Sequence, residues 1–136
     1  MSDKPKIAYI QFPGSNTETE TVATIERNNM VAVPHFWNES FEKLKKYDGY
    51  IVLGGFSYED RSRSGIIASL EPIVAQLKQE VVLGKPLLGI CNGAQILVEA
   101  GIVPGNKNFD TVVGLTENKR IKSGQIVGTG YYNTWC

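Results

Sequence analysis

Two patterns of apolar and polar residues alternate along the first hundred positions of this chain. Short apolar runs bounded by turn residues predict four buried strands, at residues 6–12, 30–36, 50–53 and 86–90. Between these runs, apolar residues recur every three or four positions, which is the spacing of amphipathic helices. The alternation of strands and helices predicts an α/β fold with a doubly wound, mainly parallel sheet.

The helical segments carry recognisable start and stop signals. Ser15 and Glu18 have the spacing of a capping box, so we expect a helix to begin there. Pro34 lies in the second strand and indicates an edge position, because proline cannot donate a ladder hydrogen bond. The best-defined helix ends at Gly84. Its apolar face is predicted to consist of Ile66, Leu70, Ile73, Val74, Leu77 and Val81.

The character of the chain changes after Pro104. Residues 106–136 are rich in Gly, Thr and Asn, with short β-type runs at 111–113 and 126–127. We expect turns and antiparallel strands there. The length of 136 residues predicts one domain that spans residues 1–136.

Charge and composition argue against several classes of function. The 14 basic residues balance the 14 acidic ones, so no broad surface for nucleic acid or an anionic membrane is expected. The apolar runs are too short to span a bilayer, and the N-terminus leads into a strand without a signal peptide. Cys91 and Cys136 form neither a disulfide framework nor a metal cluster. A reducing, cytoplasmic location is therefore expected.

The fourth apolar run leads into Gly89-Ile90-Cys91-Asn92-Gly93 and a short helical segment. Glycines two residues on either side of a cysteine have the spacing of a nucleophile elbow, a sharp turn from strand to helix. Glycine at these positions lets backbone pass close to a strained nucleophile. The helix dipole favours a thiolate at such a turn, which makes Cys91 a candidate nucleophile. The five-residue pattern alone fits a buried structural cysteine equally well.

Three loops follow the carboxyl ends of predicted strands: residues 13–16, residues 54–63 and the Cys91 elbow. Ligands of parallel sheets bind beyond the carboxyl ends of the strands. We therefore expect these loops to meet and form the site.

Three motifs in these loops resemble the class I, or triad, glutamine amidotransferases. One branch is most similar, the glutaminase component of phosphoribosylformylglycinamidine synthase, an enzyme of purine biosynthesis. The resemblance covers about residues 6–105 and implies a flavodoxin-like sheet. The motifs are Phe12-Pro13-Gly14-Ser15-Asn16, Gly54-Gly55-Phe56-Ser57-Tyr58 and Gly89-Ile90-Cys91-Asn92-Gly93-Ala94-Gln95-Ile96-Leu97.

This resemblance implies hydrolysis of glutamine to glutamate and ammonia. Cys91 would attack the side-chain amide and form a glutamyl thioester. The backbone N–H groups of Gly55 and Asn92 would form the oxyanion hole, and Gly54 and Gln95 would bind the glutamine. The ammonia would pass to a synthetase subunit that uses ATP and Mg²⁺, so no cofactor or metal is expected in this chain.

The sequence departs from the family pattern around these motifs. Glu59 stands where the family has glycine, and Thr17 stands where cysteine is common. We expect these changes to alter the packing of the loops rather than the chemistry at the nucleophile. Arg63 keeps its family position. Arg61 and Arg63 could contact a carboxylate or a partner surface, but we expect both to be solvated loop charges.

The family's catalytic histidine and carboxylate come from a C-terminal part that this sequence lacks. The one histidine, His35, precedes the cysteine, and we expect it to be hydrogen-bonded at the end of an edge strand. Without a general base, nothing returns a proton to the leaving ammonia. The resemblance therefore implies little or no glutaminase activity for these 136 residues.

Two alternatives remain open at this point. One is a cysteine-elbow hydrolase or chaperone of the DJ-1/PfpI type, although Gln95 and the glycine-rich loops argue against it. The other is a glutaminase-like binding module without catalytic activity.

Overall fold

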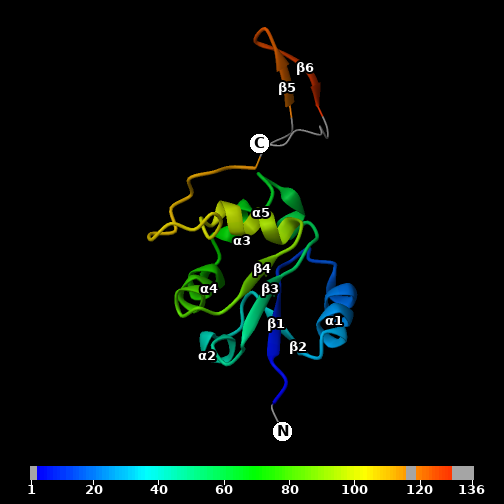
Figure 1. The fold of residues 1–136 in the computed structure, drawn as a ribbon, viewed down its shortest axis with the longest axis vertical. Coiled ribbons are helices and arrows are strands. Elements are labelled where there is room, and N and C mark those ends of the chain that lie inside the picture. Colours follow the sequence, from blue (N-terminus) through cyan, green and yellow to red (C-terminus); the bar gives the residue numbers. More distant parts are fainter. Residues whose placement is uncertain (1–2, 116–118, 130–136) are drawn as a thin grey trace.

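A parallel sheet with helices on both faces forms the body of the computed structural model, which describes residues 3–115 and 119–129 (Figure 1). The strands follow the order β2–β1–β3–β4, and every neighbouring pair is parallel. This confirms the predicted doubly wound parallel sheet. The strands are β1 (Lys6–Gln11), β2 (Val31–Phe36), β3 (Gly49–Val52) and β4 (Leu87–Gly89).

Helices connect the strands and cover the two faces of the sheet unequally. One apolar cluster joins β1 and β3 to the helices drawn to the left of the sheet in Figure 1 and to the helix after β4. A smaller cluster around Ile7, Tyr9 and Ile25 covers the opposite face. The helices are α1 (Glu18–Arg27), α2 (Phe41–Leu44), α3 (Ile66–Ser69), α4 (Pro72–Val82), α5 (Asn92–Glu99) and the 3₁₀ turn η1 (Ser57–Asp60).

The single helix predicted from residue 66 to residue 81 is wrong. The structure divides it into α3 and α4, with Pro72 as the first residue of α4. Proline disfavours a helical residue before it, and Glu71 is accordingly extended at φ −68° and ψ 144°. Leu70 lies at this break with 78% of its side chain exposed, outside the apolar face predicted for it.

The predicted capping box at Ser15 is also wrong. Helix α1 begins at Glu18, and the Ser15 hydroxyl accepts the Phe12 N–H at 3.0 Å instead. Ser15 also pairs with Gly55 in an isolated antiparallel bridge. A contact with a loop 40 residues further along the chain thus replaces the local helix start.

The two edges of the sheet test two further predictions. Strand β2 is an edge strand that contains Pro34, as expected. Strand β4 is the other edge, and its predicted burial on both faces is wrong. Leu88 is 53% exposed and Ile90 is 45% exposed, because no strand pairs with the outer side of β4 among the described residues.

A separate two-stranded antiparallel sheet follows, formed by β5 (Lys119–Lys122) and β6 (Gln125–Thr129). It confirms antiparallel pairing and places residues 126–127 in a strand, whereas residues 111–113 are irregular. Residues 116–118 and 130–136 of this predicted region lie outside the described residues. Across the described ranges, every helix is too short or too polar to span a membrane.

Candidate active site

The predicted elbow joins β4 to α5, with Cys91 at the turn. Cys91 precedes the first helical residue, is exposed, and has the strained backbone angles φ 53° and ψ −114°. A β-carbon on Gly93 would lie 2.1 Å from the Val52 carbonyl oxygen, and one on Gly89 would lie 2.7 Å from the Gly93 oxygen. Backbone therefore passes so close to both positions that only glycine fits, which accounts for the spacing around the cysteine.

The loop after β1 and the loop after β3 are joined by backbone hydrogen bonds. The Asn16 N–H donates to the Gly54 oxygen at 3.2 Å, and the Phe56 N–H donates to the Gly14 oxygen at 2.9 Å. A β-carbon on Gly55 would lie 2.5 Å from the Gly14 oxygen. A β-carbon on Gly54 would lie 3.5 Å from the Cys91 β-carbon. The three predicted loops therefore meet at Cys91, as expected.

The peptide between Gly54 and Gly55 has a defined orientation. The Asn16 bond holds its carbonyl toward the first loop, and in a trans peptide the N–H points the opposite way. The Thr17 hydroxyl accepts the preceding N–H, that of Gly54, at 3.1 Å. The Gly55 N–H thus points away from the first loop, and it makes no hydrogen bond to any residue that the structure describes.

The first residue of α5 connects the elbow to the second loop through its side chain. Asn92 is 2% exposed, and its Oδ1 accepts the Ser57 N–H at 3.1 Å. Its Nδ2 donates to the Gln95 Oε1 at 3.0 Å. The backbone N–H of Asn92 has no partner within the described ranges, as is usual at a helix start. Sequence reasoning identified this backbone group but missed the side chain, whose partner lies 35 residues away.

Comparison with known proteins agrees with this geometry. The family model of the CobB/CobQ-like glutamine amidotransferase domain matches residues 4–124. The chain belongs to this family of glutamine amidotransferases. The family relationship gives no support to the alternative of a DJ-1/PfpI-type protein.

Individual relatives make the family assignment more specific. The chain is 47% identical over 130 residues to phosphoribosylformylglycinamidine synthase subunit PurQ of Methanothrix thermoacetophila, covering 96% of this chain and 49% of that protein. It is 44% identical over 100 residues to the PurQ subunit of Pyrococcus furiosus, covering 74% and 44% of the two chains. The chain thus spans about half the length of the curated relatives it matches.

A solved structure shares the fold of the amidotransferase. A chain of PurLQS from Thermotoga maritima superposes with a TM-score of 0.69 at 28% sequence identity. The match covers 85% of this chain and 49% of that one. The resemblance inferred from the three sequence motifs is therefore confirmed.

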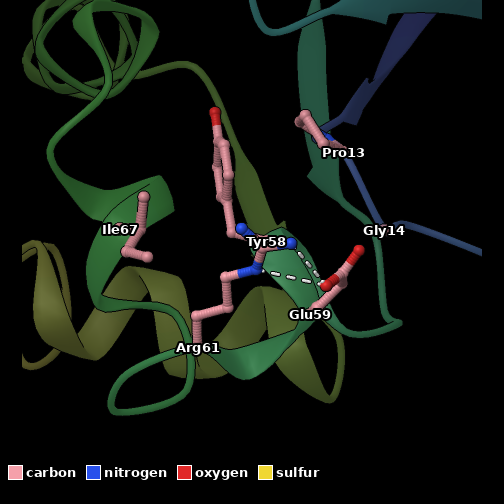
Figure 2. A pocket seen from close by; sticks show the side chains of 6 residues that line it. All are labelled: Pro13, Gly14, Tyr58, Glu59, Arg61 and Ile67. Atoms are coloured by element: carbon pink, nitrogen blue, oxygen red, sulfur yellow. Dashed lines mark hydrogen bonds and ion pairs between the residues drawn. The ribbon is translucent and has the colours of Figure 1, made fainter.

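A cavity of about 400 Å³ adjoins the loops that follow β1 and β3 (Figure 2). The first loop, η1 and α3 line it with Pro13, Gly14, Tyr58, Glu59, Arg61 and Ile67. The Arg61 guanidinium donates to the Glu59 carboxylate at 2.8 Å and 3.1 Å, as the dashed lines in Figure 2 show. The Tyr58 hydroxyl donates to Glu71 at 2.5 Å. Burial, with the Glu71 contact, raises the pKa of Tyr58 above its ordinary value, so this phenol stays neutral.

The backbone of η1 is strained beside this cavity. Tyr58, Glu59 and Asp60 all have positive φ, at 53°, 57° and 49°. Glu59 thus adopts the left-handed conformation that glycine adopts without strain, which gives a physical reason for the family's glycine at this position.

Arg63 ties the loop after β3 to the end of α5. Its guanidinium donates to both oxygens of Glu99, at 2.5 Å and 2.6 Å. The Glu99 side chain is only 5% exposed, and that of Arg63 is 63% exposed. The prediction of solvated loop charges is therefore wrong in one respect. Arg63 is exposed, but it holds a buried carboxylate, and Arg61 holds Glu59.

His35 lies on β2, which β1 and β3 separate from β4 in the sheet, and it is not brought to the elbow. It is fully buried, and neither ring nitrogen has a hydrogen-bond partner among the described residues. The predicted hydrogen bond is therefore wrong. The ring packs edge to face against Tyr47, with its Nδ1 3.9 Å from the Glu39 carboxylate. Burial lowers the pKa of His35, so the imidazole stays neutral.

Proposed function

We propose that Cys91 is the nucleophile of a glutaminase. The observation that carries the proposal is the strained, exposed Cys91 at a helix start, together with the backbone N–H groups of Gly55 and Asn92, which have no partner among the described residues. Cys91 attacks the side-chain amide carbon of glutamine and expels ammonia, leaving a glutamyl thioester that water hydrolyses to glutamate.

The two free N–H groups supply the oxyanion hole of this reaction. Negative charge develops on the amide oxygen as the sulfur attacks, and donors held in place beforehand stabilise that charge. The Asn16 N–H holds the carbonyl of the Gly54–Gly55 peptide, the Thr17 hydroxyl holds the N–H of Gly54, and the helix start holds the Asn92 N–H. Gly54 leaves room for the substrate beside the thiol, and Gln95 binds the amino-acid part of the glutamine.

The ammonia is proposed to pass to a synthetase subunit of phosphoribosylformylglycinamidine synthase. This part rests on the similarity to proteins named PurQ and to a chain of PurLQS. ATP and Mg²⁺ belong to the synthetase in this scheme, and the cytoplasm is the proposed location. The described residues contain no group of three His, Cys, Asp or Glu side chains that could hold a metal ion.

A general base is the component that these 136 residues do not supply. The one histidine is buried in β2 and has a lowered pKa. We therefore expect both thioester formation and its hydrolysis to be slow, because no histidine among the described residues lies at Cys91 to protonate the leaving ammonia or to activate water. Turnover of free glutamine by this chain at the rate of a longer relative would contradict this.

Covalent labelling tests the proposal directly. The chloroketone analogue of glutamine should label Cys91 stoichiometrically, and free glutamine should slow the labelling. Iodoacetamide reports the intrinsic accessibility of the thiol, and mass spectrometry assigns the modified peptide. Cys91→Ser should abolish labelling by the chloroketone, whereas Cys136→Ser should leave it unchanged.

One outcome would overturn the proposal. If iodoacetamide reacts with Cys91 but the chloroketone reacts without any protection by glutamine, the pocket does not recognise glutamine. Stable binding to a synthetase subunit under those conditions would favour the non-catalytic module instead.

A further inference from the structure

We propose that Asn92 is a positioning residue that determines which end of the Gln95 amide faces the substrate. The inference rests on the proposed function, because it concerns the same site. It goes further by assigning the direction of each hydrogen bond from the elbow to the ligand, and from this the group on the ligand that Gln95 binds.

The backbone N–H of Ser57 fixes the direction of the two hydrogen bonds that join Ser57, Asn92 and Gln95. The Ser57 N–H belongs to the backbone and can only donate, so the Asn92 atom at 3.1 Å must be the acceptor oxygen. The other end of the Asn92 amide is then its NH₂ group. This group can only donate, so the Gln95 atom at 3.0 Å must be the oxygen Oε1.

The hydrogen bond from Asn92 determines where the Nε2 end of the Gln95 amide can point. With Oε1 engaged by Asn92, the Nε2 group must point elsewhere, and it makes no hydrogen bond to any residue within the described ranges. Gln95 lies one helical turn after Cys91, with its N–H donating to the Cys91 oxygen at 3.1 Å. Gln95 thus lies within the first turn of the helix that begins directly after Cys91. Gln95 thus offers two N–H donors to a ligand at the nucleophile.

This polarity selects the ligand group. Two amide N–H donors match an acceptor, and the acceptor that an amino-acid substrate carries away from its reacting amide is the α-carboxylate. The buried Asn92 keeps Gln95 from rotating by half a turn, which would offer an oxygen and repel the carboxylate. Gln95 therefore recognises the carboxylate of the substrate, and Asn92 acts only through Gln95.

Asn92→Asp reverses the polarity while it keeps the shape of the side chain. The carboxylate still accepts the Ser57 N–H, but it can no longer donate, so Gln95 must turn and present its oxygen. The probes are the chloroketone analogue of glutamine and its carboxamide derivative, in which an amide replaces the α-carboxylate. We expect the wild-type chain to react at least about tenfold faster with the carboxylate form, a ratio that corresponds to about 1.4 kcal/mol. In Asn92→Asp this preference should disappear, and the rate with iodoacetamide, measured in parallel, corrects both chloroketone rates for any change in the reactivity of the thiol.

A purely structural role would give a different pattern. Loss of loop order would slow both chloroketones equally and leave the ratio of their rates unchanged, and that result would overturn the inference. Asn28→Asp is the matched control, because the Asn28 amide donates to the Thr24 oxygen on the exposed end of α1. It should leave every rate unchanged.

A second variant keeps the inference falsifiable if Asn92→Asp fails to fold. Gln95→Glu keeps an acceptor for the Asn92 NH₂ but replaces the free NH₂ by an oxygen, so the same loss of preference is expected. If Gln95→Glu retains the preference for the carboxylate, the inference is wrong. A wild-type chain without glutamine protection would contradict the proposed function itself, so the two failures are distinguishable.

Discussion

The two sides of Cys91 are built in different ways. On one side lies what we call the loop framework, residues 13–17, 54–57 and 89–95, which is held together by backbone contacts and short hydrogen bonds. On the other side lies the outer edge of β4, where Leu88 and Ile90 are about half exposed. Apolar side chains also remain exposed in what we call the later segment, the described residues after Pro104. Among them are Val112, Ile121, Ile126 and Val127.

This difference shows where the structure restricts the sequence. In the loop framework, neighbouring backbone lies within van der Waals distance of several glycines, so even one added carbon is excluded. In the later segment, side chains have open space around them and add little to the free energy of folding. The same substitution should therefore have very different effects in the two regions.

The largest expected effect comes from adding one methyl group to a glycine of the loop framework, and the same addition in the later segment is its control. Gly93→Ala places a β-carbon 2.1 Å from the Val52 oxygen, so α5 must move away from β3. We expect the free energy of unfolding to fall by about 3 kcal/mol, the upper range for overpacking. Gly114→Ala is the matched control, with no atom within 4 Å of the new carbon, and should change stability by less than about 0.5 kcal/mol. Urea denaturation measures both, and equal losses would contradict the comparison.

A smaller effect is expected where a side chain supports the loop framework. Thr17→Val keeps the shape of the residue but removes the oxygen that accepts the Gly54 N–H. Leaving this partly buried donor unpaired should cost about 1 kcal/mol. Labelling by the chloroketone should also slow, because Gly54, which precedes the proposed oxyanion-hole N–H of Gly55, is held less firmly.

Thr24→Val is the control for the loss of a hydroxyl. The Thr24 hydroxyl donates to the Glu20 oxygen on the exposed side of α1, so we expect a change below about 0.5 kcal/mol and unchanged labelling. Equal slowing of labelling in both threonine variants would show that Thr17 has no special part in the framework.

The smallest effect concerns pH and arises outside both regions, at His35. Burial holds the pKa of His35 below its ordinary value of 6.5, so the unfolded chain takes up the proton first. The stabilising contribution is therefore complete above pH 6.5 and is lost as the pH falls toward the lower pKa of the folded state. Glu39 opposes this shift, whereas Lys43 adds to it. Thermal unfolding between about pH 7.5 and about pH 5.5 should show a decline in stability that is weaker in His35→Leu, and identical slopes would contradict the assignment.

The parts of the molecule that were predictable from sequence are those specified by local patterns. Strand runs, turn glycines and the spacing around Cys91 define the parallel sheet and the elbow, because each signal lies within a few residues. The break at Pro72 was also local, yet the helical periodicity on both sides of it concealed the break.

The remaining features depend on contacts between distant segments. The Ser57–Asn92 hydrogen bond joins residues 35 positions apart, and the Arg63–Glu99 ion pair joins residues 36 apart. The packing of Ser15 against Gly55 overrode a capping box whose local spacing was correct. Such contacts leave no periodic trace in the sequence, so the second loop's support for the elbow could be seen only in three dimensions.

The pairing of segments this far apart also determines when the site comes into existence. The elbow is synthesised after both loops that frame it, and loop closure over such separations is slow compared with the formation of a local helix. The thiol of Cys91 is therefore exposed on an unframed chain during the early stages of folding and gains its selectivity only when the sheet has closed. Under the proposed function, recognition of glutamine is thus one of the last properties that this polypeptide acquires.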